Sequence, residues 1–167
     1  MKTQQNMIRE YRNFNEIKEL TSLIRAVWRE YYAPIIGVEQ VEYMLDKFQS
    51  VEAILRQIEE NYRYYGLLRE GRLAGYYAVQ PQAEEIFLSK FYVAAAFRGQ
   101  GLGKKTLQHL IDHYATPDKK TIWLTVNKKN GNSIAIYKKL GFVITESIIT
   151  DVGDGFVMDD YRMERRL

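Results

Sequence analysis

The chain has 167 residues, a length that suits one domain with a single sizeable core, and we expect residues 1–167 to form that domain. Its composition, 46% hydrophobic and 27% charged, is that of a globular protein and not of a disordered one. It has no cysteine and a net charge of +3, which excludes disulfides and a cysteine nucleophile and gives no indication of a nucleic-acid partner, but suits a small polyanionic ligand.

The first third of the chain predicts a strand followed by helices. Residues 7–11 (MIREY) have the pattern of a short strand. Apolar residues then recur at helical spacing over 14–31, and Ala33-Pro34 is expected to interrupt this helix. Two further helices are expected, one marked by Val38–Phe48 and one over 51–58 with Ser50 as its N-cap.

From residue 62 onward strands predominate. Glu70-Gly71 is a two-residue turn signal, so the runs 62–68 and 73–79 are expected to form a hairpin. The later elements are expected to be a strand at 86–93, a helix after Gly103, a strand at 121–126, a helix from about 133 to 140 with Asn132 as N-cap and Gly141 as its left-handed stop, and strands near 143–150 and 155–165. This order indicates one mixed α/β domain.

Several sites and compartments are not indicated. No apolar run approaches the ~18 residues of a membrane span, and residues 1–14 lack the apolar region of a signal peptide. We therefore expect a cytoplasmic protein with no membrane partner. His109 and His113 lack the further ligands of a zinc site, so we expect solvated helix-face residues and no metal.

A glycine-rich loop, Arg98–Gly103 (RGQGLG), lies between an expected strand and an expected helix. Glycines let the backbone approach a ligand and adopt positive φ, and the free N–H groups at the start of a helix suit a pyrophosphate. Lys104 and Lys105 are mildly unfavourable at a helix N-terminus unless an anion binds there. The loop therefore predicts a phosphate site, with a tight turn as the alternative.

Two well-known phosphate loops do not fit this segment. A P-loop would need a glycine where Arg98 stands and a serine or threonine where Lys105 stands. A dinucleotide fingerprint would need its third glycine at Lys104 or at Thr106. A nucleotide-binding module of either kind is therefore not indicated.

The loop does match the pattern R/Q-x-x-G-x-G/A, at Arg98, Gly101 and Gly103, and so resembles the acyl-CoA loop of the GNAT superfamily. Residues 126–142 (VNKKNGNSIAIYKKLGF) are similar to the family segment V-N-x-x-N-x-x-A-x-x-x-Y-x-x-x-G-F, with Ser133 where alanine is usual. Together the two segments cover roughly residues 86–142. Three stretches further resemble a bacterial PaiA-like branch of polyamine acetyltransferases: IFLSKFYV, IWLTVNKKNGNSIAIYKKLGF and VGDGFVMDDYRM.

The resemblance implies a fold and an activity. The fold would be a central, mostly antiparallel twisted sheet of about seven strands flanked by helices, with the acyl-CoA loop after the fourth strand. The activity would be acetyl-CoA-dependent N-acetyl transfer to a primary amine, by direct attack on the thioester, with a small polyamine as one acceptor class. Acetyl-CoA and a small amine would be the partners of a monomer or homodimer. An acyl-CoA-binding regulator with little or no turnover is the alternative.

The resemblance also implies roles for individual residues. Tyr137 stands where the family's tyrosine acts as general acid, and a phenol (pKa about 10) is fairly matched to a thiolate (about 8.5); otherwise it would be a core aromatic. Main-chain N–H groups around Gly99–Lys104 would hold the phosphates, and an N–H near Val93 would stabilise the oxyanion. Asn130 would bind the pantetheine arm or cap a helix. The full expected cofactor-binding set is Phe91, Tyr92, Val93, Arg98, Gly99, Gln100, Gly101, Leu102, Gly103, Lys104, Asn130 and Tyr137.

The acceptor side is less clearly marked. The candidates for a general base are Glu85, Tyr92 and Asp160. A flexible acidic loop is expected between the last two strands and would attract a polycationic amine, unless it is an ordinary turn; its acidic residues are Asp151, Asp154, Asp159 and Asp160. The candidates for the wall of an acceptor pocket, or else for core packing, are Trp28, Tyr31 and Tyr32.

Overall fold

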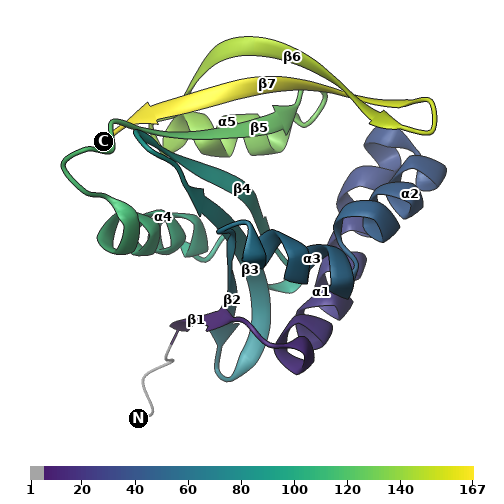
Figure 1. Cartoon of the computed structure of the whole chain (residues 1–167), viewed down its shortest axis with the longest axis horizontal. Coiled ribbons are helices and arrows are strands. Elements are labelled where there is room, and N and C mark those ends of the chain that lie inside the picture. Colours follow the sequence, from purple (N-terminus) through teal and green to yellow (C-terminus); the bar gives the residue numbers. More distant parts are fainter. Residues whose placement is uncertain (1–5) are drawn as a thin grey trace.

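A computed structural model describes residues 6–167 (Figure 1). Within these residues seven strands form one sheet, in the order β1-β2-β3-β4-β5-β7-β6. The strands are β1 (Asn6–Tyr11), β2 (Arg63–Arg69), β3 (Arg72–Pro81), β4 (Glu85–Val93), β5 (Thr121–Asn127), β6 (Val143–Gly153) and β7 (Phe156–Arg166). The helices are α1 (Phe14–Ile36), α2 (Val38–Phe48), α3 (Val51–Glu59), the 3-10 turn η1 (Ala95–Phe97), α4 (Leu102–Tyr114) and α5 (Gly131–Lys139). All strand neighbours are antiparallel except β4 and β5, so the expected mixed α/β fold with a mostly antiparallel sheet is confirmed.

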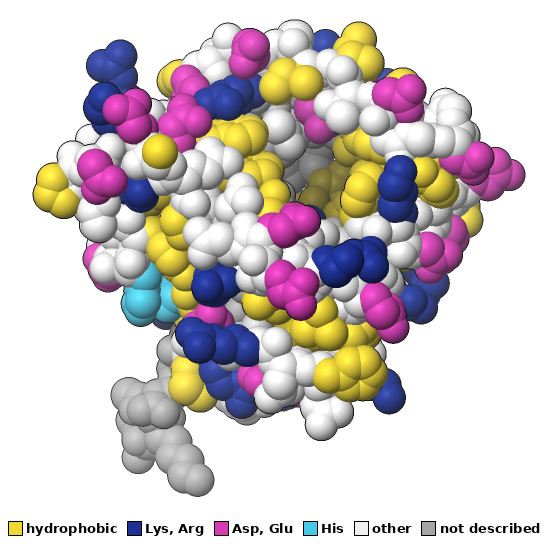
Figure 2. All heavy atoms as spheres, in the orientation of Figure 1, with side chains coloured by type: hydrophobic (Ala, Val, Ile, Leu, Met, Phe, Trp, Pro, Cys, Tyr) yellow, Lys and Arg dark blue, Asp and Glu magenta, His cyan; other side chains and the backbone are white. Residues whose placement is uncertain are grey.

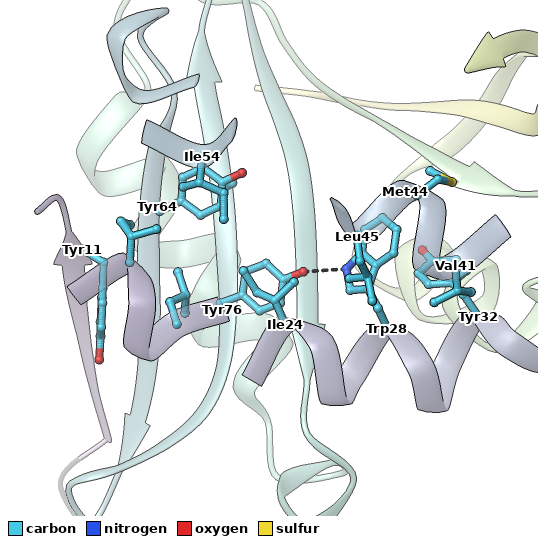
Figure 3. Packing of buried hydrophobic residues seen from close by; sticks show 13 residues of the cluster. Tyr11, Ile24, Trp28, Tyr32, Val41, Met44, Leu45, Ile54, Tyr64 and Tyr76 are labelled. Carbon is cyan, nitrogen blue, oxygen red and sulfur yellow. Dashed lines mark hydrogen bonds between the residues drawn. The ribbon is translucent and has the colours of Figure 1, made fainter. Parts of the chain in front are cut away.

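The sheet separates two hydrophobic cores. Because successive side chains of a strand point to opposite faces, Tyr64 and Tyr76 pack against α1, α2 and α3, whereas Tyr65 and Tyr77 lie in the core formed with α4 and α5. Figure 3 shows the first core, in which the Trp28 indole N–H donates to the Tyr76 hydroxyl at 2.8 Å. We call these the α1–α3 face and the α4–α5 face.

The sheet opens between β4 and β5. The two strands pair only over Glu85–Phe87 and Thr121–Trp123, although β4 continues to Val93 and β5 to Asn127. Beyond the paired residues they diverge, which Figure 1 shows as a gap between β4 and the β5–β7 strands.

A β-bulge lies in β4 where this divergence begins. Ala78 of β3 pairs with Lys90 and Val79 pairs with Leu88, which leaves Ser89 as the extra residue. An extra residue shifts the alternation of the strand by one position. Leu88 therefore faces the α4–α5 core before the bulge, and Phe91 faces it after the bulge.

The sequence predicted an interruption of helix α1 at Ala33-Pro34, and this prediction is wrong. The helix continues to Ile36, and the Gly37 N–H bonds to the Ala33 carbonyl at 3.0 Å. A proline removes one helical N–H donor. Because only two helical residues follow Pro34, the loss falls in the last turn, and the helix continues past it. None of the helices in residues 6–167 combines the length and apolar composition required to cross a membrane.

Two details at the ends of elements confirm or correct the sequence pattern. The turn Glu70-Gly71 has φ of 51° and 75°, as the expected β2–β3 hairpin requires. Helix α5 begins two residues earlier than expected, because its N-cap is Asn130 and not Asn132; the Asn130 side chain accepts from the Ser133 N–H at 3.2 Å. Gly141 after this helix has φ of 92°, the left-handed stop that was expected.

The prediction of a flexible acidic loop between the last two strands is wrong. Strands β6 and β7 are joined by only two residues, Asp154 and Gly155, and the other three aspartates belong to the strands. Asp159 forms an ion pair with Lys128 (2.8 Å), while Asp160 is 8% exposed. Hydrogen bonding in the ladder therefore fixes these side chains on different faces of a hairpin, and they do not gather in a flexible loop.

Candidate active site

A narrow cleft occupies the opening between β4 and β5, and we call it the splay cleft. Side chains from α1, β4, β5 and α5 converge on it, and its volume is about 20 Å³. Its lining residues are Tyr32, Leu88, Ser89, Lys90, Phe91, Tyr92, Leu124, Thr125, Val126, Asn130, Ser133 and Tyr137. Four of the residues expected at the cofactor site, from β4 and α5, are thus brought together here.

The glycine loop lies directly before α4. Gly99 and Gly101 have φ of 73° and 77°, and a Cβ at either position would meet no atom within 4 Å. Gly101 is the N-cap of α4 and has no side chain to accept from the helix, so the first three N–H groups of the helix, Leu102–Lys104, have no helical acceptor. Free amides, open space and the exposed Lys104 and Lys105 form a suitable site for a phosphate.

A wider groove of about 580 Å³ runs between the end of α1 and the start of α5. Its lining includes three cationic side chains: Arg98, Lys129 and Lys139. Arg98 reaches across to α1, where it forms an ion pair with Glu30 (3.0 Å) and lies 4.5 Å from the ring centre of Tyr31. Its side chain therefore ties the loop to α1, and the charge of Arg98 is offset by Glu30, which also lines the groove.

Tyr137 belongs both to the α4–α5 core and to the splay cleft. Its ring lies edge-on to Phe142, with ring centres 5.8 Å apart, and it contributes to the cleft lining. Burial, and to a lesser extent the neighbouring Tyr32 and Tyr31, raise the pKa of Tyr137 well above its usual value. The hydroxyl therefore stays protonated at neutral pH, as a proton donor must.

Because of the bulge at Ser89, the alternation of β4 places Tyr92 on the face opposite to Leu88, Phe91 and Val93. Phe91 and Val93 pack in the α4–α5 core, whereas the Tyr92 side chain lies on the α1–α3 face, hydrogen-bonded to the Tyr32 hydroxyl. Burial raises the pKa of Tyr92 far above its usual range. Tyr92 is therefore a poor candidate for a general base at neutral pH.

The aromatic candidates of α1 have different places. Trp28 is buried in the α1–α3 core, where its indole N–H donates a hydrogen bond to Tyr76. Tyr31 lines the groove and Tyr32 lines the splay cleft. Two of the three therefore border the openings of the site.

The other two base candidates lie at opposite ends of the opening. Glu85 forms an ion pair with Arg162 (3.0 Å), where β4 and β5 are still paired. Asp160 lies farther along, opposite Asn127 of β5. Burial, and then the charge of Asp159, raise the pKa of Asp160 to about 6, against the opposing effect of Lys128.

Lys90 is a cleft residue that the sequence analysis missed. Its ammonium donates to the Tyr64 hydroxyl at 2.8 Å and to Gln57 Oε1 at 3.4 Å. It has no carboxylate within ion-pair distance among residues 6–167, and burial lowers its pKa to about 7. The available signal was a lysine in the otherwise mostly apolar strand IFLSKFYV.

The two histidines are not equivalent. His113 is exposed, as expected, but His109 is half-buried and lies 2.6 Å from the Tyr77 hydroxyl through Nδ1. Its neighbours include the ring of His113, with ring centres 3.9 Å apart. In the described part of the chain, no three histidine or acidic side chains are arranged to hold a metal ion.

Comparison with known proteins gives a consistent result. Residues 20–142 match the model of the acetyltransferase (GNAT) family. The spermine/spermidine N(1)-acetyltransferase of Bacillus subtilis (strain 168) is 32% identical over 130 residues, which are 71% of this chain and 86% of that enzyme. The ribosomal protein bS18-alanine N-acetyltransferase of Escherichia coli (strain K12) is 35% identical over 83 residues, 50% of this chain and 56% of that enzyme.

Solved structures show the same fold. The PaiA N-acetyltransferase from Thermoplasma acidophilum, crystallised in complex with coenzyme A, has a TM-score of 0.82 and 21% identity, and the match covers 98% of this chain and 99% of that one. The E. coli ribosomal-protein-S18-alanine N-acetyltransferase has a TM-score of 0.68 and 21% identity over 97% and 94% of the two chains. At these identities the likeness concerns the fold.

Proposed function

Because the chain belongs to the GNAT family of N-acetyltransferases, in a PaiA-like branch, we propose that it transfers the acetyl group of acetyl-CoA to a primary amine and that the acceptor is a small polyamine. The observation that carries the proposal is the opening of the sheet between β4 and β5. There Tyr137 lines a cleft together with β4, the strand that is followed along the chain by the glycine loop at the start of α4.

The proposed cosubstrate site extends from the glycine loop to the cleft. The free N–H groups of Leu102–Lys104, with Gly99 and Gly101 leaving room, would hold the phosphates. Lys129 and Lys139, in the lining of the groove, favour a polyanion. When bound, acetyl-CoA supplies the thioester whose acetyl group is transferred.

Strand β4 is proposed to hold the pantetheine arm. Over Phe91–Val93 the strand pairs with β3 on one edge and has lost its β5 partner on the other. The unpaired N–H and C=O groups of that edge need acceptors and donors, which amide groups of the arm would provide. Asn130 uses its side-chain oxygen to cap α5, and we propose that its NH₂ group faces the same arm.

Tyr137 is proposed to donate the proton that the sulfur needs as the carbon–sulfur bond breaks. The phenol is protonated at neutral pH, and its place in the cleft lining puts it beside β4. A positioned proton donor contributes about 10²–10⁴-fold to a rate.

The polyamine acceptor is supported by the B. subtilis relative, whose name states that substrate class and which matches 71% of this chain. The E. coli relative matches only half of the chain, so its acceptor, a ribosomal protein alanine, serves as a comparison. An acyl-CoA-binding regulator would share the cosubstrate site but lack turnover.

The test is an acetylation assay with purified protein, acetyl-CoA and four acceptors: spermidine, spermine, putrescine and a peptide that begins with alanine. Released CoA can be followed with a thiol reagent, and the chain itself adds no background because it has no cysteine. We expect turnover with the polyamines, confirmed by mass spectrometry of the acetylated product. Binding of CoA without turnover of any amine would favour the regulator instead.

A further inference from the structure

The carboxylate of Asp160 is buried without a partner. The residue is 8% exposed, and its Oδ1 is inaccessible to solvent and has no hydrogen-bond donor. Glu10 also has an oxygen without a hydrogen bond, but it forms ion pairs with Arg12 and Arg63. Among residues 6–167, Asp160 is thus the one acidic side chain with an orphaned buried oxygen and no ion pair. Buried carboxylates are normally paired, so this one indicates a donor from outside the chain.

Asp160 points to the α1–α3 face of the sheet. In β7 it alternates with Tyr161, which packs in the α4–α5 core, and it shares a face with Met158, which packs against the α1–α3 core. Its charge contributes to the raised pKa of Tyr32, a buried side chain of the α1–α3 core. Tyr32 in turn bonds to Tyr92 and lines the splay cleft.

Tyr137 reaches the same opening from the other side. It belongs to α5 and packs in the α4–α5 core. Its pKa responds to Tyr32 and Tyr31, so the cluster around Tyr32 is within electrostatic reach of both Tyr137 and Asp160. A reaction centre in the cleft would therefore have a proton donor on one face and a carboxylate on the other.

The surface on the α1–α3 side is open to an amine. Figure 2 shows a hollow bordered by apolar side chains, in the space that Figure 1 shows between β4, β7 and α2. The phenol rings of Tyr31, Tyr32 and Tyr92 lie within 6.3 Å of one another, measured between ring centres. Aromatic faces attract an ammonium group, and the unpaired carboxylate is on the same face of the sheet as these rings.

Lys90 is a partly buried titratable residue that lines the cleft. Its Nζ is directed to Tyr64 and to Gln57 of α3, where it serves as a hydrogen-bond donor. Asp160 has no such partner. The geometry therefore favours the carboxylate over the lysine as the proton acceptor.

We propose that Asp160 is the general base of the reaction: it binds the ammonium group of the acceptor, which enters from the α1–α3 face, and takes its proton. This inference rests on the proposed N-acetyltransferase function. An N–H bond of the ammonium breaks and the proton passes to Asp160. The freed nitrogen lone pair forms the bond to the acetyl carbon as the carbon–sulfur bond breaks, and Tyr137 gives its hydroxyl proton to the leaving sulfur. The proton still in excess on the nitrogen restores Tyr137 through water, and Asp160 releases its proton to solvent.

The groups around Asp160 set its titration. From β7 itself, Asp159 raises the pKa of Asp160, and Lys128 beyond the end of β5 lowers it. Tyr32 faces it from α1 and is neutral at working pH, because burial raises its pKa to about 12. Burial remains the largest effect and raises the pKa of Asp160 to about 6, so the base is ionised at neutral pH and the activity should fall below about pH 6.

The experiment compares kcat/KM against pH for wild type and Asp160→Asn, with the best acceptor of the panel. We expect Asp160→Asn to lose about 10²–10⁴-fold at neutral pH and to lose the acidic limb of the profile. The deficit should shrink towards about pH 10, where the free acceptor amine needs no base. CoA affinity and circular dichroism should match wild type, which shows that the variant is folded.

Two further variants make the result specific. Asp159→Asn removes the adjacent, exposed carboxylate of the same strand and should keep kcat/KM within about twofold, with the acidic limb shifted slightly downward. Lys90→Met should keep the acidic limb. A wild-type profile in Asp160→Asn, a deficit that does not change with pH, or loss of the limb in Lys90→Met would each overturn the assignment of Asp160. Absence of turnover in the wild-type protein would instead overturn the proposed function on which it rests.

Discussion

At the residue scale, the hydroxyl of Tyr137 can be removed without removing its ring. Tyr137→Phe keeps the contact with Phe142, so it isolates the proposed proton donation. We expect kcat to fall by about 10²–10⁴-fold, while the acetyl-CoA dissociation constant changes little. Steady-state kinetics and calorimetry measure the two quantities. A kcat within twofold of wild type would mean that Tyr137 only packs.

Lys90 gives a prediction about stability. Its pKa falls from 10.5 in the unfolded chain to about 7 in the fold, so between these values the unfolded chain binds more protons and the free energy of unfolding rises with pH. Lys90→Met removes the free-energy cost of burying this ammonium group, a cost that is fully present below about pH 7. The variant lacks the hydrogen bond from Lys90 to the Tyr64 hydroxyl, but this hydroxyl keeps its own hydrogen bond to Gln57 (2.5 Å).

We therefore expect Lys90→Met to exceed wild type in unfolding free energy by on the order of a few kcal/mol at pH 7. The advantage should shrink at about pH 9.5, because wild type then gains stability. Urea titrations at both pH values measure the difference. An advantage that is equal at the two pH values would show that Lys90 is not neutralised by folding.

At the scale of elements, the start of α4 depends on a backbone conformation. Gly101 has φ of 77°, which a β-branched residue adopts only with strain. Gly101→Val should move the loop and so weaken CoA binding severely, about 10²-fold or more if the loss reaches ~3 kcal/mol. Calorimetric titration with CoA measures it.

Gly37→Val is the matched control for this change. Gly37 lies at the junction of α1 and α2, has φ of 88°, and likewise has open space around it. It should suffer a similar loss of stability but keep its CoA affinity. Unchanged affinity in a folded Gly101→Val variant would refute the proposed phosphate site.

The elements were more predictable from the sequence than the contacts between them. Local signals such as Glu70-Gly71 and Gly141 gave a turn and a helix stop that the structure confirms. The prediction that Pro34 interrupts α1 was wrong, because the effect of a proline on helix stability depends on how many helical residues follow it. The prediction of an acidic loop failed because strand pairing, a non-local interaction, extends β6 and β7 almost to the turn.

The site shows the same limit. The pattern around Arg98–Gly103 located the glycine loop, and the motif around Tyr137 located a cleft residue. The importance of Asp160 and Lys90 follows from burial by distant elements, to which no local pattern refers. The bulge at Ser89, which shifts the alternation of the following side chains by one position, was equally invisible in the sequence.

At the scale of the whole molecule, two halves of the sheet meet over three residue pairs of β4 and β5. The proposed cosubstrate would contact both halves. We expect CoA at about 100 times its dissociation constant to add ~2.7 kcal/mol to the unfolding free energy and to raise Tm by about 5–10 °C. Calorimetric scans with and without CoA test this.

The control ligand is pantetheine, which lacks the phosphates. It should raise Tm less than CoA at equal concentration, because it leaves the amides of Leu102–Lys104 without an anion. Equal shifts with the two ligands would mean that the glycine loop contributes nothing to binding.

The joint between the two halves contains a natural optical reporter. Trp123 is paired with Phe87 at the last position before the strands diverge, and the two rings are stacked with centres 4.0 Å apart. The only other tryptophan, Trp28, lies in the α1–α3 core. Replacing Trp28 with phenylalanine would leave Trp123 as the single tryptophan of the protein. The emission of Trp123 would then report any change in its stacking on Phe87 when CoA is mixed with the protein in a stopped-flow instrument, without any attached dye.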